Sequence, residues 1–176
     1  IIRAAVETVA ESIMDGIIAP LFYCFLGGPI WMWIYKAINT LDSMVGHKSQ
    51  RYIEFGRVSA KLDGIMNFIP ARLASFLIGI SCWFCRKNGF GAFGWGFRYF
   101  FKGPGFNSQM TESAMAGALG VQLGGTNYYH CVACPGPFIG DNLCPLSIKH
   151  IKDSICIAYI CSGLFITVGL FLLRGR

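Results

Sequence analysis

The acidic residues near the start of the chain are the first candidates for chemistry. Glu7, Glu11 and Asp15 follow one another at intervals of four residues. On an α-helix this spacing places the three carboxylates along one face, each about one turn from the next. Three like charges in a row repel one another, so a cation is expected opposite them. The row therefore predicts either a solvated helix face or a binding face for Mg²⁺ or a cationic partner.

A second candidate set lies in residues 36–72, where acidic, basic and amide side chains are mixed. Basic side chains could bind phosphate groups, and carboxylates could hold Mg²⁺ together with substrate phosphates. Steps of three and four residues place four charged residues on one helical face: Arg51, Glu54, Arg57 and Lys61. This indicates either an exposed face with salt bridges or a cationic surface facing the acids or an anionic ligand. The candidate residues of this stretch are Asn39, Asp42, Arg51, Arg57, Lys61, Asp63, Asn67 and Arg72.

The composition indicates where these side chains must work. The 176 residues suit a single domain, residues 1–176, but 54% are hydrophobic and only 14% charged, whereas soluble proteins are about 25% charged. The mean hydropathy is +0.51. The net charge is +6, and the basic residues flank apolar stretches, as they do beside lipid head groups. We therefore expect a membrane protein that contacts the lipid bilayer and does not bind nucleic acid.

The apolar segments predict an all-α, polytopic integral membrane protein with broken or re-entrant helices. Residues 1–15 form an amphipathic helix. Residues 16–35 are long enough to span a bilayer but are interrupted at Gly27-Gly28-Pro29, which indicates a kinked span or a re-entrant pair. Residues 73–85 are short for a span, and we expect them to be re-entrant. Residues 155–173 are the clearest transmembrane helix, at the C-terminal end.

The region between these apolar segments holds a further set of polar residues. Residues 90–101, rich in glycine and aromatic rings, suit a membrane interface. A helix of small residues is predicted to begin near Thr111, with Ser108 as its N-cap, and to end at Gly124-Gly125. Small residues allow helices to approach closely, and the start of a helix can bind an anion. The candidates here are Asn107, Ser108, Glu112, Asn127 and Tyr128.

The eight cysteines include two C-x-x-C pairs, which raises the question of a zinc site. Cys82 and Cys85 lie in an apolar run, as do Cys24, Cys156 and Cys161. A structural zinc site is expected on polar, turn-rich segments. We therefore expect buried, reduced thiols that act as small apolar side chains.

Three stretches carry a resemblance to a known family: residues 7–28, 35–72 and 107–129. They include the runs KAINTLDSMVG and AMAGALGVQLGGTNYY. In this order and spacing the chain resembles the CbiB/CobD family of membrane proteins, the adenosylcobinamide-phosphate synthases of cobalamin (vitamin B12) biosynthesis. Members of that family are longer at the N-terminus, so we expect this chain to be a C-terminal portion. A histidine of the family is replaced here by Gly103.

The resemblance implies an ATP-dependent amide ligase. Adenosylcobyric acid, a corrinoid, would be joined to (R)-1-aminopropan-2-ol or its O-phosphate, with ATP and Mg²⁺ activating the carboxylate. Glu7, Glu11 and Asp15 would hold Mg²⁺, most directly Glu7 and Glu11, or the ammonium of the amine. The remaining roles are also implied. Asn39, Asp42 and Asp63 would complete a polar wall, and Asp42 and Asp63 are grouped with the three acids as catalytic. Phosphate or propionate groups would be bound by Arg51, Arg57, Lys61 and Arg72. An anion would be bound by Asn107, Ser108 and the backbone N–H groups that open the helix near Glu112, and a side-chain amide would be oriented by Asn127 and Tyr128.

Two other classes compete with the ligase. One is a non-catalytic membrane relative, such as an AmpE-like sensor or scaffold, and the other is a transporter of small solutes. The resemblance further implies a multi-pass protein of the inner (cell) membrane, with its site on the cytoplasmic side where ATP is found. Other membrane enzymes of the cobalamin pathway are expected as neighbours.

Overall fold

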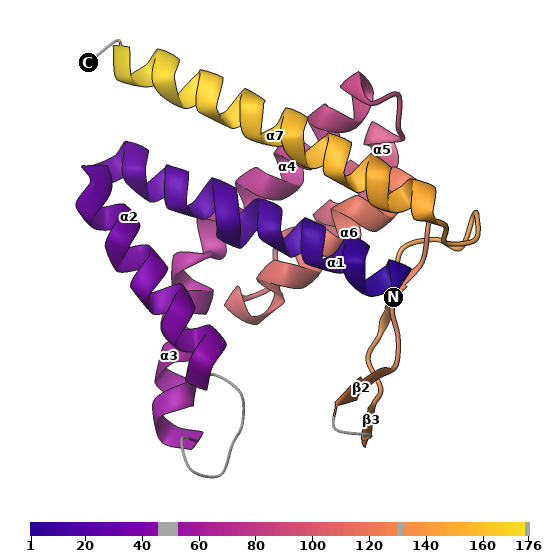
Figure 1. The fold of residues 1–176 in the computed structure, drawn as a ribbon, viewed down its shortest axis with the longest axis horizontal. Helices are drawn as coiled ribbons and strands as arrows, with labels where there is room; N and C mark the ends of the chain where they lie inside the picture. Colours follow the sequence, from indigo (N-terminus) through magenta and orange to yellow (C-terminus); the bar gives the residue numbers. More distant parts are fainter. Residues whose placement is uncertain (46–52, 130–131, 175–176) are drawn as a thin grey trace.

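The computed structural model describes residues 1–45, 53–129 and 132–174, without the side chains of residues 53–55, 127–129 and 132–133. Helices dominate it (Figure 1). Two helical runs of the described chain, Ile2–Val45 and Ile148–Arg174, are long and apolar enough to cross a membrane, and a bent helix pair gives a third if it counts as one span. The protein is an all-α, polytopic membrane protein, as the sequence predicts.

The N-terminal run combines three helical segments. It consists of α1 (Ile2–Ser12), a π-helical turn η1 (Ile13–Ile18) and α2 (Ala19–Val45). The predicted interruption is confirmed, because Gly27 and Gly28 leave helical geometry and Gly28 has a φ of 78°. A left-handed φ is accessible to glycine without steric cost, and Pro29 then resumes the helix without needing an N–H partner.

The second part of α2 packs against α3 (Ile53–Met66), and both extend away from the rest of the molecule (Figure 1). From Gly56 onward, α3 is bent by 49° relative to α4 (Phe68–Phe84), with Asn67 between the two helices. The long α7 (Ile148–Arg174) lies beside α1 and confirms the C-terminal span.

The middle of the chain differs from the sequence prediction in its helix boundaries. The aromatic stretch is a helix, α5 (Gly89–Phe100), followed by a short 3₁₀ turn, η2 (Pro104–Phe106). The helix α6 (Asn107–Leu119) begins earlier than predicted, so Ser108 lies inside its first turn and is not its N-cap. It ends at Gly120, which has a φ of 66°, and not at Gly124-Gly125. A glycine with a left-handed φ ends a helix well, because its backbone N–H can bond to one of the last helical carbonyls, here that of Ala116.

Two small antiparallel ladders follow α6. In one, β1 (Leu123–Gly124) pairs with β4 (Phe138–Ile139), with Leu123 opposite Ile139. In the other, β2 (Asn127–Tyr129) pairs with β3 (Val132–Cys134). Residues 140–147 then connect β4 to α7.

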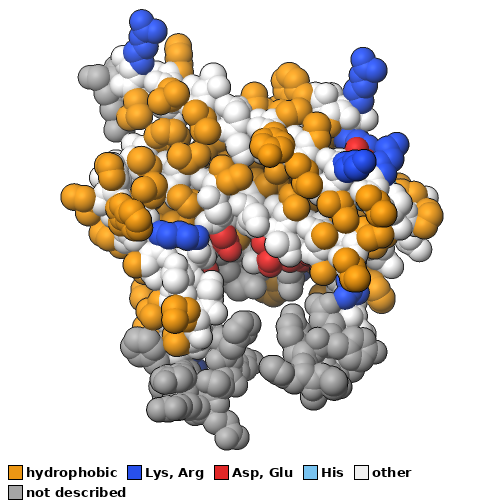
Figure 2. All heavy atoms as spheres, viewed as in Figure 1, with side chains coloured by type: hydrophobic (Ala, Val, Ile, Leu, Met, Phe, Trp, Pro, Cys, Tyr) orange, Lys and Arg blue, Asp and Glu red, His pale blue; other side chains and the backbone are white. Residues whose placement is uncertain are grey.

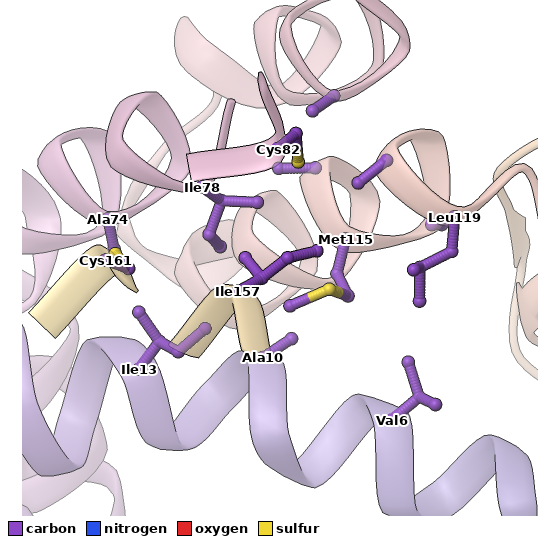
Figure 3. Packing of buried hydrophobic residues seen from close by; sticks show 14 of the residues in the cluster. Val6, Ala10, Ile13, Ala74, Ile78, Cys82, Met115, Leu119, Ile157 and Cys161 are labelled. Carbon is purple, nitrogen blue, oxygen red and sulfur yellow. The ribbon is translucent and has the colours of Figure 1, made fainter. Parts of the chain in front are cut away.

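The core lies where α1, α4, α6 and α7 meet. Figure 3 shows side chains from all four helices pointing toward one another, and the labelled cysteines pack among them. Cys82 and Cys161 are fully buried, which confirms the prediction for these two. The prediction of burial is wrong for Cys156, which is exposed, and Cys24 and Cys85 are only half-buried. On the other side of α6, the backbones of Gly91 and Gly117 touch, so a Cβ on either glycine would overlap the other's carbonyl. The small residues of α6 therefore serve close helix packing, as predicted.

Candidate functional site

Acidic side chains from different elements gather on one side of this core. They are Glu7 and Glu11 of α1, Asp15 of η1, Asp63 of α3 and Glu112 of α6, and each lies within electrostatic reach of at least one other. Figure 2 shows acidic side chains together near the middle of one face. Ionisable groups within apolar, membrane-spanning helices are costly and usually mark function. This acidic cluster, defined by these five residues, is the candidate site.

Within the cluster, Glu11 and Glu112 share a hydrogen bond across the contact between α1 and α6. Two ionised carboxylates only accept hydrogen bonds, so such a bond forms when one of the two carries a proton. Glu112 lies outside the candidate spans. Burial raises its pKa from the ordinary 4.5 to about 8, and the negative charges of Glu11 and Glu7 contribute further to this rise. A cation bound between the two carboxylates would take the place of the proton.

Glu7 is held in a different way from Glu11. Its Oε1 lies 3.7 Å from Nε of Arg3 and accepts a hydrogen bond from the backbone N–H of Gly124. Arg3 in turn donates to the carbonyls of Gly124 and Thr126. Glu7 therefore anchors the turn after α6, and its charge is already balanced by a neighbour.

Asp15 faces a second group of side chains. It lies near Asp63, Glu11 and Lys36 and contacts Asn39. Its Oδ1 is shielded from solvent and has no hydrogen-bond partner among the described residues. A buried oxygen of this kind is costly unless a ligand or water meets it. The π-helical turn that carries Asp15 is itself a geometry found frequently at functional sites.

Glu7, Glu11 and Asp15 thus lie on one side of the N-terminal run, but each contacts different partners. Glu11 turns to α6, whereas Asp15 turns to α2 and α3. A π-helical turn contains an extra residue and breaks the i, i+4 register between them. Spacing alone could not show this division.

Asp63 is held by two amide side chains. Asn39 Nδ2 donates to its Oδ1 over 3.1 Å, and Asn67 Nδ2 donates to its Oδ2 over 3.0 Å. Lys36 Nζ donates to Asn39 Oδ1 over 3.0 Å, and the hydroxyl of Tyr35 donates to Asn67 Oδ1 over 2.9 Å. Asn67 was expected in the polar cluster but without an assigned role, and Lys36 and Tyr35 were not among the predicted site residues. Tyr35 lies at the end of an apolar stretch, and its sequence position carries no signal for this role.

Arg72 has a structural position that the sequence did not indicate. Its Nη1 donates to the carbonyl of Phe68 and lies 3.4 Å from Asn107 Oδ1, and its Nη2 donates to the carbonyls of Phe100 and Lys102. The guanidinium also lies 3.4 Å from the centre of the Phe68 ring. Arg72 therefore joins α4 to the end of α5, and these bonds occupy donors that a phosphate would need.

Asn107 is likewise engaged within the protein. It is buried and donates to the carbonyl of Gly64 over 2.8 Å, which connects α6 to α3. Ser108 is half-buried beside it, and its carbonyl accepts a hydrogen bond from Thr111. These two residues place the start of α6, and with it Glu112, against the other helices.

The remaining predicted residues lie around the acidic cluster or outside the description. Asp42 is half-buried on α2, one turn after Asn39, whereas Arg57 and Lys61 are exposed on α3. Arg51 lies outside the described residues. Asn127 and Tyr128 belong to β2, but their side chains are not described.

A cavity of about 550 Å³ is lined by residues of α4, α5 and α6, and none of the five acids is among them. Its lining is almost wholly apolar, with Phe76, Phe93, Phe97 and Phe100 as its rings and Arg72 at one end. It is thus distinct from the acidic cluster.

Among the described residues, no three Asp, Glu, His or Cys side chains are close enough to form a metal site of their own. Mg²⁺, however, often binds through one or two carboxylates together with waters and substrate phosphates. The pair Glu11 and Glu112 fits that mode. Glu7, predicted with Glu11 as a metal ligand, is already bound to Arg3 and Gly124.

Comparison with known proteins decides the family. The family model for CobD/Cbib protein matches residues 1–158. The chain belongs to the CobD/Cbib family. It is 47% identical over 164 residues to cobalamin biosynthesis protein CbiB of Salmonella typhimurium, covering 92% of this chain and 51% of that protein.

Relatives from other bacteria agree with this membership. Cobalamin biosynthesis protein CobD of Listeria monocytogenes is 47% identical over 160 residues, which cover 91% of this chain and 51% of the relative. The CobD protein of Citrobacter koseri is 48% identical over 164 residues, 92% of this chain and 51% of the relative. The chain thus spans about half the length of the curated relatives it matches. The comparison with solved structures gave no match.

Proposed function

We propose that this protein is a membrane-bound, ATP-dependent amide ligase of cobalamin biosynthesis. It would join adenosylcobyric acid to (R)-1-aminopropan-2-ol or its O-phosphate, giving adenosylcobinamide or its phosphate. Family membership supports the pathway. The observation that carries the proposal is the acidic cluster, because an aminoalcohol enters such a reaction as an ammonium that must be bound and deprotonated.

Asp15 and Asp63 are best placed to bind the amine. Asp15 offers an oxygen with no partner among the described residues, and each oxygen of Asp63 accepts one amide N–H. A carboxylate oxygen has room for two hydrogen bonds, so both oxygens of Asp63 can still accept an ammonium N–H. One of these carboxylates would accept the proton that the amine must lose before it can attack a carbonyl.

Glu11 and Glu112 are the residues that would hold Mg²⁺ for the nucleotide. ATP, when bound, supplies the activation of the corrinoid carboxylate, which is otherwise unreactive toward amines. The two carboxyls already stand together across α1 and α6, and they are adjacent to Asp15. Mg²⁺ with its nucleotide and the amine would thus be held side by side. This proximity favours attack of the amine on the carboxylate that ATP activates. Since ATP is cytoplasmic, this face would lie on the cytoplasmic side of the inner membrane.

Complementation tests the proposal. The intact gene is expressed in a strain that cannot attach aminopropanol, with adenosylcobyric acid and aminopropanol supplied. The proposal predicts cobalamin-dependent growth. Growth on supplied cobinamide, which lies after the missing step, confirms that the rest of the pathway works. If the protein is present in the membrane and only cobinamide restores growth, the ligase assignment is wrong and a non-catalytic relative is favoured.

A further inference from the structure

A buried chain of hydrogen bonds runs from Tyr35 through Asn67 to Asp63. Tyr35 is 0% exposed and Asn67 1% exposed. The tyrosine hydroxyl donates to Asn67 Oδ1, and Asn67 Nδ2 donates to Asp63 Oδ2. Because a carboxylate only accepts, Asp63 fixes which way the amide of Asn67 faces. The amide oxygen then requires a donor, which the tyrosine supplies.

Asn67 also lies at the bend between α3 and α4. Its backbone N–H donates to the carbonyl of Asp63 over 2.8 Å, and its own carbonyl accepts from the N–H of Ala71 over 2.9 Å. The backbone at the bend and the side chain on Asp63 are therefore fixed together. A rotation of the Asn67 side chain would break bonds to both of its buried partners, so its geometry is defined by the fold.

The other oxygen of Asp63 is restrained from the exposed side. Asn39 donates to it and accepts from Lys36, which is exposed. The carboxylate is thus held between a hydroxyl in the core and a cation at the surface, each acting through one amide. Supporting hydrogen bonds of this kind hold a reacting group in its productive orientation.

We propose that Tyr35 and Asn67 are positioning residues that hold the Asp63 carboxylate in the orientation at which it receives the amine substrate. The inference rests on the proposed function but goes beyond it, because neither residue touches a substrate. Their loss should weaken use of the amine specifically. Use of ATP and of the corrinoid, which bind elsewhere, should remain.

Tyr23 offers a matched control. Its ring stacks on that of Tyr35 with centroids 5.3 Å apart, and its hydroxyl donates to the carbonyl of Met66 over 2.8 Å. Tyr35→Phe removes a hydroxyl that donates to Asn67 Oδ1 and, over a longer 3.5 Å, to the carbonyl of Asp15, and Tyr23→Phe removes a hydroxyl with one hydrogen bond in the same layer. Only the first removes a bond in the chain that ends at Asp63.

The test measures amide formation by the complete protein in membranes, with each substrate varied in turn. Tyr35→Phe should raise the KM for the amine about fivefold, the equivalent of one hydrogen bond, and leave the KM for ATP and for the corrinoid unchanged. Asn67→Asp, which keeps the shape but loses the donor, should raise the amine KM further. Tyr23→Phe should leave it at the wild-type value. Equal amine KM values for Tyr35→Phe and Tyr23→Phe would overturn the proposal.

A second measurement separates this inference from the proposed function. The thermal stabilisation of each purified protein by aminopropanol is recorded without ATP or corrinoid. If wild type forms no amide but the amine protects wild type and Tyr23→Phe more than Tyr35→Phe, the ligase assignment fails and the positioning role stands. If the amine protects all three proteins equally, or none of them, the positioning role is wrong.

Discussion

Glu11 of α1 and Glu112 of α6 share a hydrogen bond that two ionised carboxylates could not form. The pKa of Glu112, raised to about 8, favours a proton at this contact at neutral pH. Under the proposed function, Mg²⁺ would bind at this contact in place of the proton.

The first prediction concerns pH. The pKa of Glu112 is raised from 4.5 to about 8 in the folded protein, chiefly by burial. The native state therefore binds a proton more tightly than the unfolded state, so its contribution to stability is complete below 4.5 and is lost as the pH rises through about 8. The melting temperature of the wild type in detergent should fall over this range.

Glu112→Gln provides the comparison for that titration. Its neutral amide can donate a hydrogen bond to Glu11 at every pH, so its melting temperature should depend less on pH between 4.5 and 8. Added Mg²⁺ should stabilise the wild type more at pH 8 than at pH 4.5, because the proton competes with the cation. Identical pH slopes in the two proteins would contradict this account of the pair.

The second prediction separates a structural arginine from an exposed lysine. Arg72→Lys cannot reach all the carbonyls that the guanidinium joins, and the loss of a hydrogen bond costs about 0.5–1.5 kcal/mol. The free energy of unfolding should fall by that amount. Lys61→Ala, at an exposed position on α3, should change it by less than about 0.5 kcal/mol. Equal stability of the two variants in denaturant titrations would show that Arg72 does not clamp α4 to α5.

The third prediction concerns the contact between α5 and α6. Gly117→Ala places a Cβ against the backbone of Gly91, and overpacking of this kind costs about 1–3 kcal/mol. Gly94→Ala in α5 meets open space and should stabilise that helix by about 0.5–1 kcal/mol. Melting temperatures should move in opposite directions. A neutral Gly117→Ala would mean that the helices can separate without loss.

The sequence predicts the membrane character, the break at Gly27-Gly28 and the C-terminal span because each depends on local composition. It predicts too late a start for α6. The helix begins at Asn107, which is buried and hydrogen-bonded to the Gly64 carbonyl of α3. A favourable N-cap at Ser108 is worth about 1 kcal/mol, and tertiary packing outweighs it.

The candidate site was predictable in its acids but not in their partners. Glu7, Glu11 and Asp15 are recognisable from spacing, and Asp63 from the polar stretch that contains it. Nothing in the local sequence shows that Glu112 meets Glu11, or that Tyr35 reaches Asp63 through Asn67, because these contacts join separate helices. For Arg72 the sequence suggested a role that the structure does not support. Its charge suggested that it binds a ligand, but its guanidinium donates to backbone carbonyls of its own chain.

The central claim is that the acidic cluster binds and deprotonates an amine for amide ligation. The most direct test is amine-dependent amide formation in membranes carrying Asp15→Asn, Asp63→Asn or Asp153→Asn. Asp153 is an acid outside the cluster, paired with Lys87. The account predicts that Asp15→Asn and Asp63→Asn each lower the rate at least about 100-fold, while Asp153→Asn stays near wild type at equal protein level. Wild-type rates in both cluster variants would contradict it.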